Sequence, residues 1–348
     1  MQVAPSLSLP GAVETPTDSL DAGVAWHFGD PLGEQKRLLS GNGFVDISNR
    51  GVVTVRGPAR LEWLNNITAQ KVDQLAPNSS ALNLILSPHG HVEFELHQVD
   101  DGETTWLIVE GVQAQALVSY LESMKFMTEV EISDVSDEFA VIWEPKGEVD
   151  ESGLPTWLVP SFFATGQMSG TGESKGGDPS RYVPNRPAFL RGREVIVPRE
   201  QIQQRMKDAG APAGVWALEA LRVNAGVPRI GFETDHRTLP HEVGWLGAGV
   251  HLEKGCYRGQ EAVARVHNLG KPPRALVLLH LDGMDEELPA HLAPVTIDGE
   301  EVGWVATAVR HFEQGPIATA VLKSKYASAP QAKVGETNAH VQPVVVVR

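Results

Sequence analysis

The apolar and polar positions in the first half of the chain follow two patterns, one typical of strands and one typical of helices. Residues 44–55 alternate with a period of two, which predicts a strand. Residues 81–99 hold two apolar runs separated by residues 87–90 (SPHG), and this arrangement predicts a hairpin. Residues 113–126 repeat apolar side chains at helical spacing. Strands packed against helices are therefore expected.

The second arm of that hairpin carries two acidic residues on one face. Residues 91–96 (HVEFEL) alternate strictly, so Glu93 and Glu95 point to the same side of the strand. The default interpretation of such a pair is a solvated face of an edge hairpin. A functional role for Glu95 depends on further observations.

The pattern changes after residue 140 and again after residue 273. Residues 169–180 are nearly free of apolar side chains, which predicts a mobile loop inside a small inserted unit. Short apolar runs separated by Gly, Pro and Asp fill the last quarter of the chain, as in a small β-barrel. We expect a flexible leader over 1–40, a main domain in two parts over 41–140 and 211–272, an inserted α+β domain over 141–210 and a barrel over 273–348.

Composition narrows the class of protein. The 348 residues are enough for two or three domains, and the net charge of −15 argues against a general nucleic-acid binder. One cysteine cannot form an intramolecular disulfide, so the reducing cytoplasm is the expected compartment. No apolar run approaches the roughly 20 residues that span a bilayer, and the N-terminus lacks the features of a signal peptide.

The single cysteine lies in the octet Lys254 to Glu261 (KGCYRGQE), between two glycines and next to cationic side chains. A lone cysteine is usually a small buried hydrophobe. Nearby cations, however, lower a thiol pKa, and glycines allow close approach of a ligand, so Cys256, Lys254 and Arg258 are candidate reactive residues. The thiol's role is left open between a redox-sensitive nucleophile, a transient metal or cluster ligand and a site that captures a one-carbon unit or an electrophile. Tyr257 either stacks on a ring or packs.

Three segments together resemble one family. The octet, residues 221–228 (LRVNAGVP) and the turn–helix–hairpin layout of residues 57–96 are similar to the folate-binding YgfZ proteins. These are relatives of the T-protein, the aminomethyltransferase of the glycine cleavage system. The resemblance implies an α+β, T-protein-like ring of three domains, with mixed or antiparallel sheets and helices, a ferredoxin-like inserted unit and a C-terminal β-barrel.

The resemblance also implies a tetrahydrofolate, or a one-carbon-substituted folate, in a central channel. Glu95 stands where T-proteins place an aspartate near the reactive folate nitrogens, and Asn224 where they place a glutamate that grips the pterin. Glu110 stands where an asparagine lies at the edge of the folate site. Trp245, which precedes the octet, is expected to line the channel that Cys256 faces. Lys254 and Arg258 either lower the thiol pKa or hold the anionic folate tail, and no metal ligand set is expected.

The leading functional hypothesis from this resemblance is a monomeric folate-binding protein that assists assembly or repair of 4Fe–4S clusters. Its partners would be iron–sulfur apo-proteins or cluster-assembly proteins, and its clients the radical enzymes that modify tRNA. Neither a membrane nor nucleic acid in general is an expected partner. The alternative is a folate-dependent aminomethyltransferase or other one-carbon transferase. Against it, the Glu95 side chain is one methylene longer than aspartate, and Asn224 lacks a carboxylate. A scaffold that binds no folate ranks last.

Overall fold

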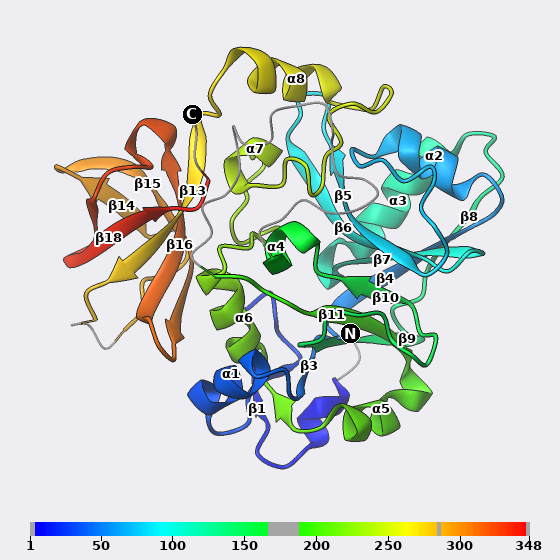
Figure 1. Ribbon diagram of the computed structural model, residues 1–348, viewed down its shortest axis with the longest axis horizontal. Helices are drawn as coiled ribbons and strands as arrows, with labels where there is room; N and C mark the ends of the chain where they lie inside the picture. Colours follow the sequence, from blue (N-terminus) through cyan, green and yellow to red (C-terminus); the bar gives the residue numbers. More distant parts are fainter. Residues whose placement is uncertain (1–3, 166–187, 284–286, 346–348) are drawn as a thin grey trace.

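The computed structural model describes residues 4–165, 188–283 and 287–345. The loop predicted over residues 169–180 lies outside these ranges. A closed barrel and two five-stranded sheets lie around the middle of the molecule, where α6 runs (Figure 1).

The first sheet is antiparallel and forms one wall of the centre. Its strand order is β5 (Ser79–Leu86), β6 (Val92–Asp100), β7 (Thr104–Glu110), β4 (Arg50–Arg56) and β8 (Glu131–Asp134). The predicted hairpin is confirmed, because β5 and β6 pair with Leu84 opposite Glu95. One face packs apolar side chains with those of α2 (Arg60–Ile67) and α3 (Ala114–Lys125). The other face contributes residues such as Val52 and Leu84 to the central core.

The second sheet joins strands from three distant parts of the chain. Its order is β10 (Thr156–Leu158), β11 (Arg193–Pro198), β9 (Phe139–Glu144), β3 (Phe44–Asp46) and β12 (Pro212–Ala213). Only β12 and β3 pair in parallel. Because β9 pairs with β3, the strands of residues 141–210 complete a sheet that begins at residue 44, which covers an otherwise open edge. The helices α4 (Ser161–Thr165) and α5 (Ile202–Ala209) belong to this part of the chain.

The prediction of a flexible leader over residues 1–40 is wrong for the residues described. They form η1 (Pro5–Ser8), β1 (Val13–Glu14), β2 (Ala25–His27) and α1 (Pro31–Leu39). Val24 and Leu38 are fully buried in the central core, and Asp30 caps α1 by accepting a 2.9 Å hydrogen bond from the Gly33 N–H. Apolar burial and a capped helix therefore order this segment.

The predicted C-terminal barrel is confirmed. Its strands in closed order are β13 (Arg274–Leu281), β16 (Gly315–Lys323), β15 (Glu300–His311), β14 (Pro294–Ile297), β17 (Gln331–Val334) and β18 (Thr337–Pro343). Inward side chains such as Val277, Val305 and Ala320 are completely buried. The predicted fold class, mixed and antiparallel sheets with helices and a small barrel, is confirmed with it.

The segment between the second sheet and the barrel runs through the centre. It holds α6 (Val215–Asn224), α7 (Pro240–Val243) and α8 (Gln260–Leu269). Short 3₁₀ turns occur elsewhere in the chain, at η2 (Gly111–Gln113), η4 (Arg199–Gln201) and η5 (Ser324–Tyr326). The helix α6 packs against α1, β2 and β15, so it contacts the N-terminal segment and the barrel at once. No helix in the described ranges is both long and apolar enough to cross a membrane.

Candidate functional site

A narrow cavity lies where the two sheets meet α6, and we call it the inner cavity. Its volume is about 60 Å³. Side chains from the first sheet, the second sheet, α6 and the loop after α6 line it. The charged members are Arg50, Glu95, His97, Glu194, Glu219, Arg222 and Arg229, and the aromatic members are Trp143, Trp157 and Phe163. A pocket this rich in charge inside a protein core is a candidate binding site.

Glu95 is held in the inner cavity at both carboxylate oxygens. The residue is 8% exposed. Its Oε2 accepts a 2.9 Å hydrogen bond from the Ile230 N–H, and its Oε1 lies 3.6 Å from Nε2 of His97. The loop after α6 therefore fixes an acidic group that comes from β6.

His97 lies two residues further along β6, on the same face as Glu95. Its ring stacks on Trp157 with centroids 3.7 Å apart and planes 3° from parallel. Its Nδ1 is 2.8 Å from Oε2 of Glu194. Burial alone lowers the pKa of His97, but the Glu194 and Glu95 carboxylates outweigh it and raise the pKa to about 9. The imidazole is therefore cationic at neutral pH.

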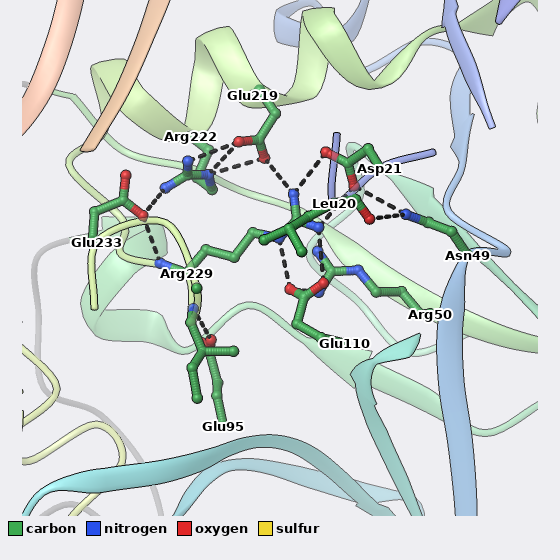
Figure 2. A network of polar contacts seen from close by, with 12 residues as sticks. Leu20, Asp21, Asn49, Arg50, Glu95, Glu110, Glu219, Arg222, Arg229 and Glu233 are labelled. Atoms are coloured by element: carbon green, nitrogen blue, oxygen red, sulfur yellow. Dashed lines mark hydrogen bonds and ion pairs between the residues drawn. The ribbon is translucent and has the colours of Figure 1, made fainter. Parts of the chain in front are cut away.

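Arg229 is the centre of a buried ionic network beside the cavity, which Figure 2 shows. Its guanidinium lies 2.7 Å from Asp21 and 2.7 Å from Glu110, and 3.3 Å from Glu219. Arg50 also pairs with Glu110. Although burial alone would raise the pKa of Asp21 and of Glu110, the Arg229 charge lowers both. These carboxylates are therefore ionised at neutral pH.

A second arginine links the network to the barrel. Arg222 on α6 pairs with Glu219 at 2.7 Å and with Glu233 at 2.8 Å. Glu233, which is completely buried, also accepts hydrogen bonds from the hydroxyls of Thr307 at 2.7 Å and Thr319 at 2.6 Å. Both threonines belong to the barrel, so this network ties α6 to the C-terminal strands.

A larger cavity of about 740 Å³ adjoins the inner one, and we call it the outer cavity. Trp143 and Leu190 line both cavities. Polar side chains from α6 and the barrel line the outer cavity: Asn224, His280, His311 and Gln342.

His311 lines the outer cavity and has one buried ring nitrogen without a partner among the described residues. The residue is 3% exposed, and its Nδ1 accepts hydrogen bonds from the backbone N–H groups of Glu313 and Gln314, both at 3.2 Å. Burial lowers the pKa of His311, so the ring is neutral and its proton is on Nε2. That Nε2 has no hydrogen-bond partner among the described residues.

The structure separates the residues that the resemblance placed around one folate. Glu95 lines the inner cavity and Asn224 the outer cavity, on either side of Trp143 and Leu190. Glu110 is engaged by Arg229 and Arg50. Trp245 is completely buried in the central core.

The octet is anchored through its lysine. The Lys254 ammonium is buried and donates hydrogen bonds to the backbone carbonyls of Asn65, Thr68 and Gln70, the last two at 2.9 and 2.8 Å. Burial lowers the pKa of Lys254 to about 8. Its position among three carbonyls shows that it holds the loop against the segment after α2.

Arg258 and Tyr257 also have partners within the protein. Arg258 pairs with Glu93 at 2.8 Å, so the predicted solvated face of the hairpin holds this ion pair. Tyr257 is packed in the central core, where burial raises the pKa of its hydroxyl. The predicted cations next to the thiol are thus committed to other groups.

Of the two glycine positions in the octet, one requires glycine and the other does not. Gly259 has φ +84°, and a Cβ there would lie 2.5 Å from the carbonyl oxygen of Ser87. It therefore lets the loop approach the hairpin backbone at the start of α8. A Cβ on Gly255 would meet nothing within 4 Å. Cys256, between them, is exposed and lines neither the inner nor the outer cavity.

Several cavity residues were not predicted from the sequence, among them His97, Glu194 and Arg229. His97 had a usable signal, because it continues the two-residue alternation of Glu93 and Glu95 on β6. Glu194 is a buried charge at the start of a strand that continues with apolar residues 195–197, which also marks an unusual position. Arg229 carries no such local signal, because it pairs with Asp21, 208 residues away. Within the described ranges, no cluster of three or more His, Cys, Asp or Glu is placed to hold a metal ion.

The octet gives a direct test of which residue is structural. Replacing Lys254 with methionine is expected to lower the free energy of unfolding by about 1–3 kcal/mol, because three carbonyls lose their donor. Cys256→Ser is expected to change it by less than about 0.5 kcal/mol, because the thiol is exposed. Urea unfolding followed by circular dichroism measures both. A larger loss for the serine variant would contradict the assignment.

Comparison with known proteins first shows which family model and which known fold the chain matches. Residues 27–143 match the family described as GCVT N-terminal domain. That segment contains all five strands of the first sheet, including the strand that carries Glu95 and His97. The crystal structure of glycine cleavage system aminomethyltransferase T from Bartonella henselae is similar, with a TM-score of 0.73 and 17% identity, covering 96% of this chain and 93% of that one. The chain therefore has the T-protein fold.

Individual relatives are similar over nearly the whole length. The aminomethyltransferase of Streptomyces avermitilis is 26% identical over 334 residues, which cover 92% of this chain and 89% of the relative. The aminomethyltransferase of Pelodictyon phaeoclathratiforme is 27% identical and covers 85% and 83%. That of Geobacillus kaustophilus is 28% identical and covers 80% and 78%.

These relatives correct the leading functional hypothesis. A role in assembly or repair of iron–sulfur clusters was expected, but relatives that match 80–92% of the chain are named for aminomethyl transfer. The alternative, a folate-dependent aminomethyltransferase or other one-carbon transferase, is better supported. The octet gives no physical support for the cluster role, because its lysine donates to backbone carbonyls and its arginine pairs with Glu93.

Proposed function

We propose that this protein is a folate-dependent one-carbon transferase of the aminomethyltransferase type. The observation that carries the proposal is the extent of the likeness, which reaches 92% of this chain and 89% of an aminomethyltransferase. The centre of the same fold holds a buried acidic group, Glu95, at the wall of a charged cavity. The fold, the extent of the likeness and the buried carboxylate of Glu95 together favour one-carbon transfer as the activity.

The length of Glu95 is not an obstacle to this function. The sequence argument was that one extra methylene misplaces the carboxylate. In the structure that carboxylate is held by the Ile230 N–H at 2.9 Å and faces His97, so the longer side chain has a defined position. A positioned carboxylate at the cavity wall can act as an acid or base toward a bound amine.

The residues of the two cavities fit a folate. A pterin carries amino and ring N–H donors, which the carboxylates of Glu95 and Glu194 can accept. The outer cavity, at about 740 Å³, is within the range of small-molecule sites, whereas the inner cavity is much smaller. The outer cavity thus supplies the room and the inner cavity the acid groups.

The protein's own residues would bind and orient the folate and would exclude water from the reacting groups. A bound tetrahydrofolate supplies the nitrogen nucleophile that receives the one-carbon unit. Glu95 would take or return a proton at its Oε1 atom, which lies 3.6 Å from Nε2 of His97, and the aromatic side chains of Trp157 and Trp143 would keep water from the reacting groups. Arg222 and Arg229 fix α6 and the following loop, and with them the Ile230 N–H that holds Glu95.

Binding of tetrahydrofolate tests the proposal. Titration under anaerobic conditions is expected to quench tryptophan fluorescence at one saturable site, because Trp143 and Trp157 line the cavities. Trp157→Phe is expected to reduce the amplitude of the quench. Trp304→Phe in the barrel is the matched control and is expected to leave the fractional quench nearly unchanged. An absence of saturable binding, confirmed by calorimetry, would overturn the proposal.

A further inference from the structure

His97 occupies a fixed position at the wall of the inner cavity. The stack on Trp157 sets the plane of its ring, and the 2.8 Å contact with Glu194 sets its rotation. Its side chain is 16% exposed, so it borders the cavity without facing bulk solvent. Because the plane and the rotation of its ring are both fixed, His97 can hold a neighbouring side chain in a defined position.

Both ring nitrogens of His97 face carboxylates. Nδ1 contacts Glu194, and Nε2 lies at ion-pair distance from Glu95. A neutral imidazole has one donor and one acceptor, whereas the imidazolium has two donors. Two carboxylate neighbours are therefore satisfied only by the charged ring. Loss of the proton would leave one carboxylate facing a lone pair.

The other cationic side chains that line the inner cavity pair with carboxylates other than Glu95. The charged groups around His97 come from four parts of the fold: Arg50 on β4, Glu194 on β11, Glu219 and Arg222 on α6, and Arg229 after α6. The three arginines pair with Asp21, Glu110, Glu219 and Glu233. Among the ion pairs of the described residues, the partner of Glu95 is His97.

We propose that His97 is a positioning residue, which holds the Glu95 carboxylate toward the ligand, so that ligand binding in the cavity requires the proton on His97. The inference rests on the proposed function for the identity of the ligand. It goes further in assigning a proton-linked switch to a residue outside the pattern of the resemblance. His97 acts through Glu95 and Glu194 in this role and is not itself a catalytic residue.

The pH dependence of ligand affinity tests the inference. The probe is 5-formyltetrahydrofolate, chosen because it resists oxidation, and calorimetry from pH 6.5 to 10 gives its Kd. Wild type is expected to show a constant Kd up to about pH 8 and a weakening of roughly tenfold by pH 10, as the imidazolium with a pKa of about 9 loses its proton. His97→Gln is expected to bind more weakly at pH 7 and to show little change up to pH 10. Identical pH profiles for the two proteins would overturn the inference.

A second measurement decides the inference without the ligand. NMR titration of the wild-type protein is expected to place the His97 midpoint near 9, with a step in the Glu95 carboxyl carbon shift at the same pH. Glu194→Gln is expected to lower that midpoint. A midpoint below 7, or no coupled step at Glu95, would overturn the positioning role. If the probe binds at no pH, the proposed function fails, and this titration still decides the role of His97.

Discussion

Replacing Arg229 with methionine is expected to lower the free energy of unfolding by about 3–5 kcal/mol at pH 7. The variant would leave Asp21 and Glu110 buried without their shared cation. It would also loosen the loop whose Ile230 N–H holds Glu95, so ligand affinity should fall with stability. Guanidinium unfolding followed by tryptophan fluorescence measures the loss.

The effect of Arg229→Met should depend on pH in a defined direction. Arg229 lowers the pKa of Asp21 and Glu110 in the folded protein, against burial, which alone would raise it. The stabilisation is therefore present above the unfolded-state pKa values near 4 and is lost as the pH falls below them. The difference between wild type and variant should therefore be complete near pH 7 and shrink as the pH falls below about 4. Arg191→Met is the control, because its ion pair with Glu148 is exposed and worth at most about 1 kcal/mol. An equal loss in the control would contradict the account.

Glu95→Gln is expected to reduce the rate of transfer by a factor of about 10²–10⁴, the usual contribution of a positioned acid or base. The amide keeps the size of the side chain, and its oxygen can still accept the Ile230 N–H, so the free energy of unfolding should change little. The loss should appear in kcat, and the Kd for tetrahydrofolate should rise as well, because the same carboxylate is proposed to accept hydrogen bonds from the pterin.

Glu93→Gln provides a matched comparison for Glu95→Gln. It makes the same chemical change on the same strand, two residues away, but Glu93 is partly exposed and pairs with Arg258. Its transfer rate should stay within about twofold of wild type. Equal losses for the two variants would show that the effect comes from disturbance of β6 rather than from the acid group.

Much of the architecture follows from local patterns in the sequence. Strict alternation over residues 91–96 correctly predicts the hairpin strand that presents Glu95, and regularly spaced short apolar runs predict the barrel. These features depend on neighbouring residues only. The second sheet was not predicted, because β3 and β12 come from segments more than 160 residues apart and pair through short, weakly patterned strands.

The site was predicted less completely, for a physical reason. The cavity depends on pairs such as Asp21 with Arg229 and His97 with Glu194, which no local pattern connects. Lys254 shows the opposite error. Its position beside a cysteine suggested a reactive loop, but its ammonium binds the backbone of residues 65–70, and only the folded chain reveals that those carbonyls lie there. Adjacency in sequence does not establish contact between side chains.

The most direct test of the proposed function is transfer itself. The purified full-length protein is mixed with tetrahydrofolate and an aminomethyl donor, and formation of methylenetetrahydrofolate is followed together with release of ammonia. We predict turnover by wild type that requires tetrahydrofolate, that is lost in Glu95→Gln and that is kept in Glu93→Gln. Saturable tetrahydrofolate binding without turnover, or turnover that survives Glu95→Gln unchanged, would contradict the account.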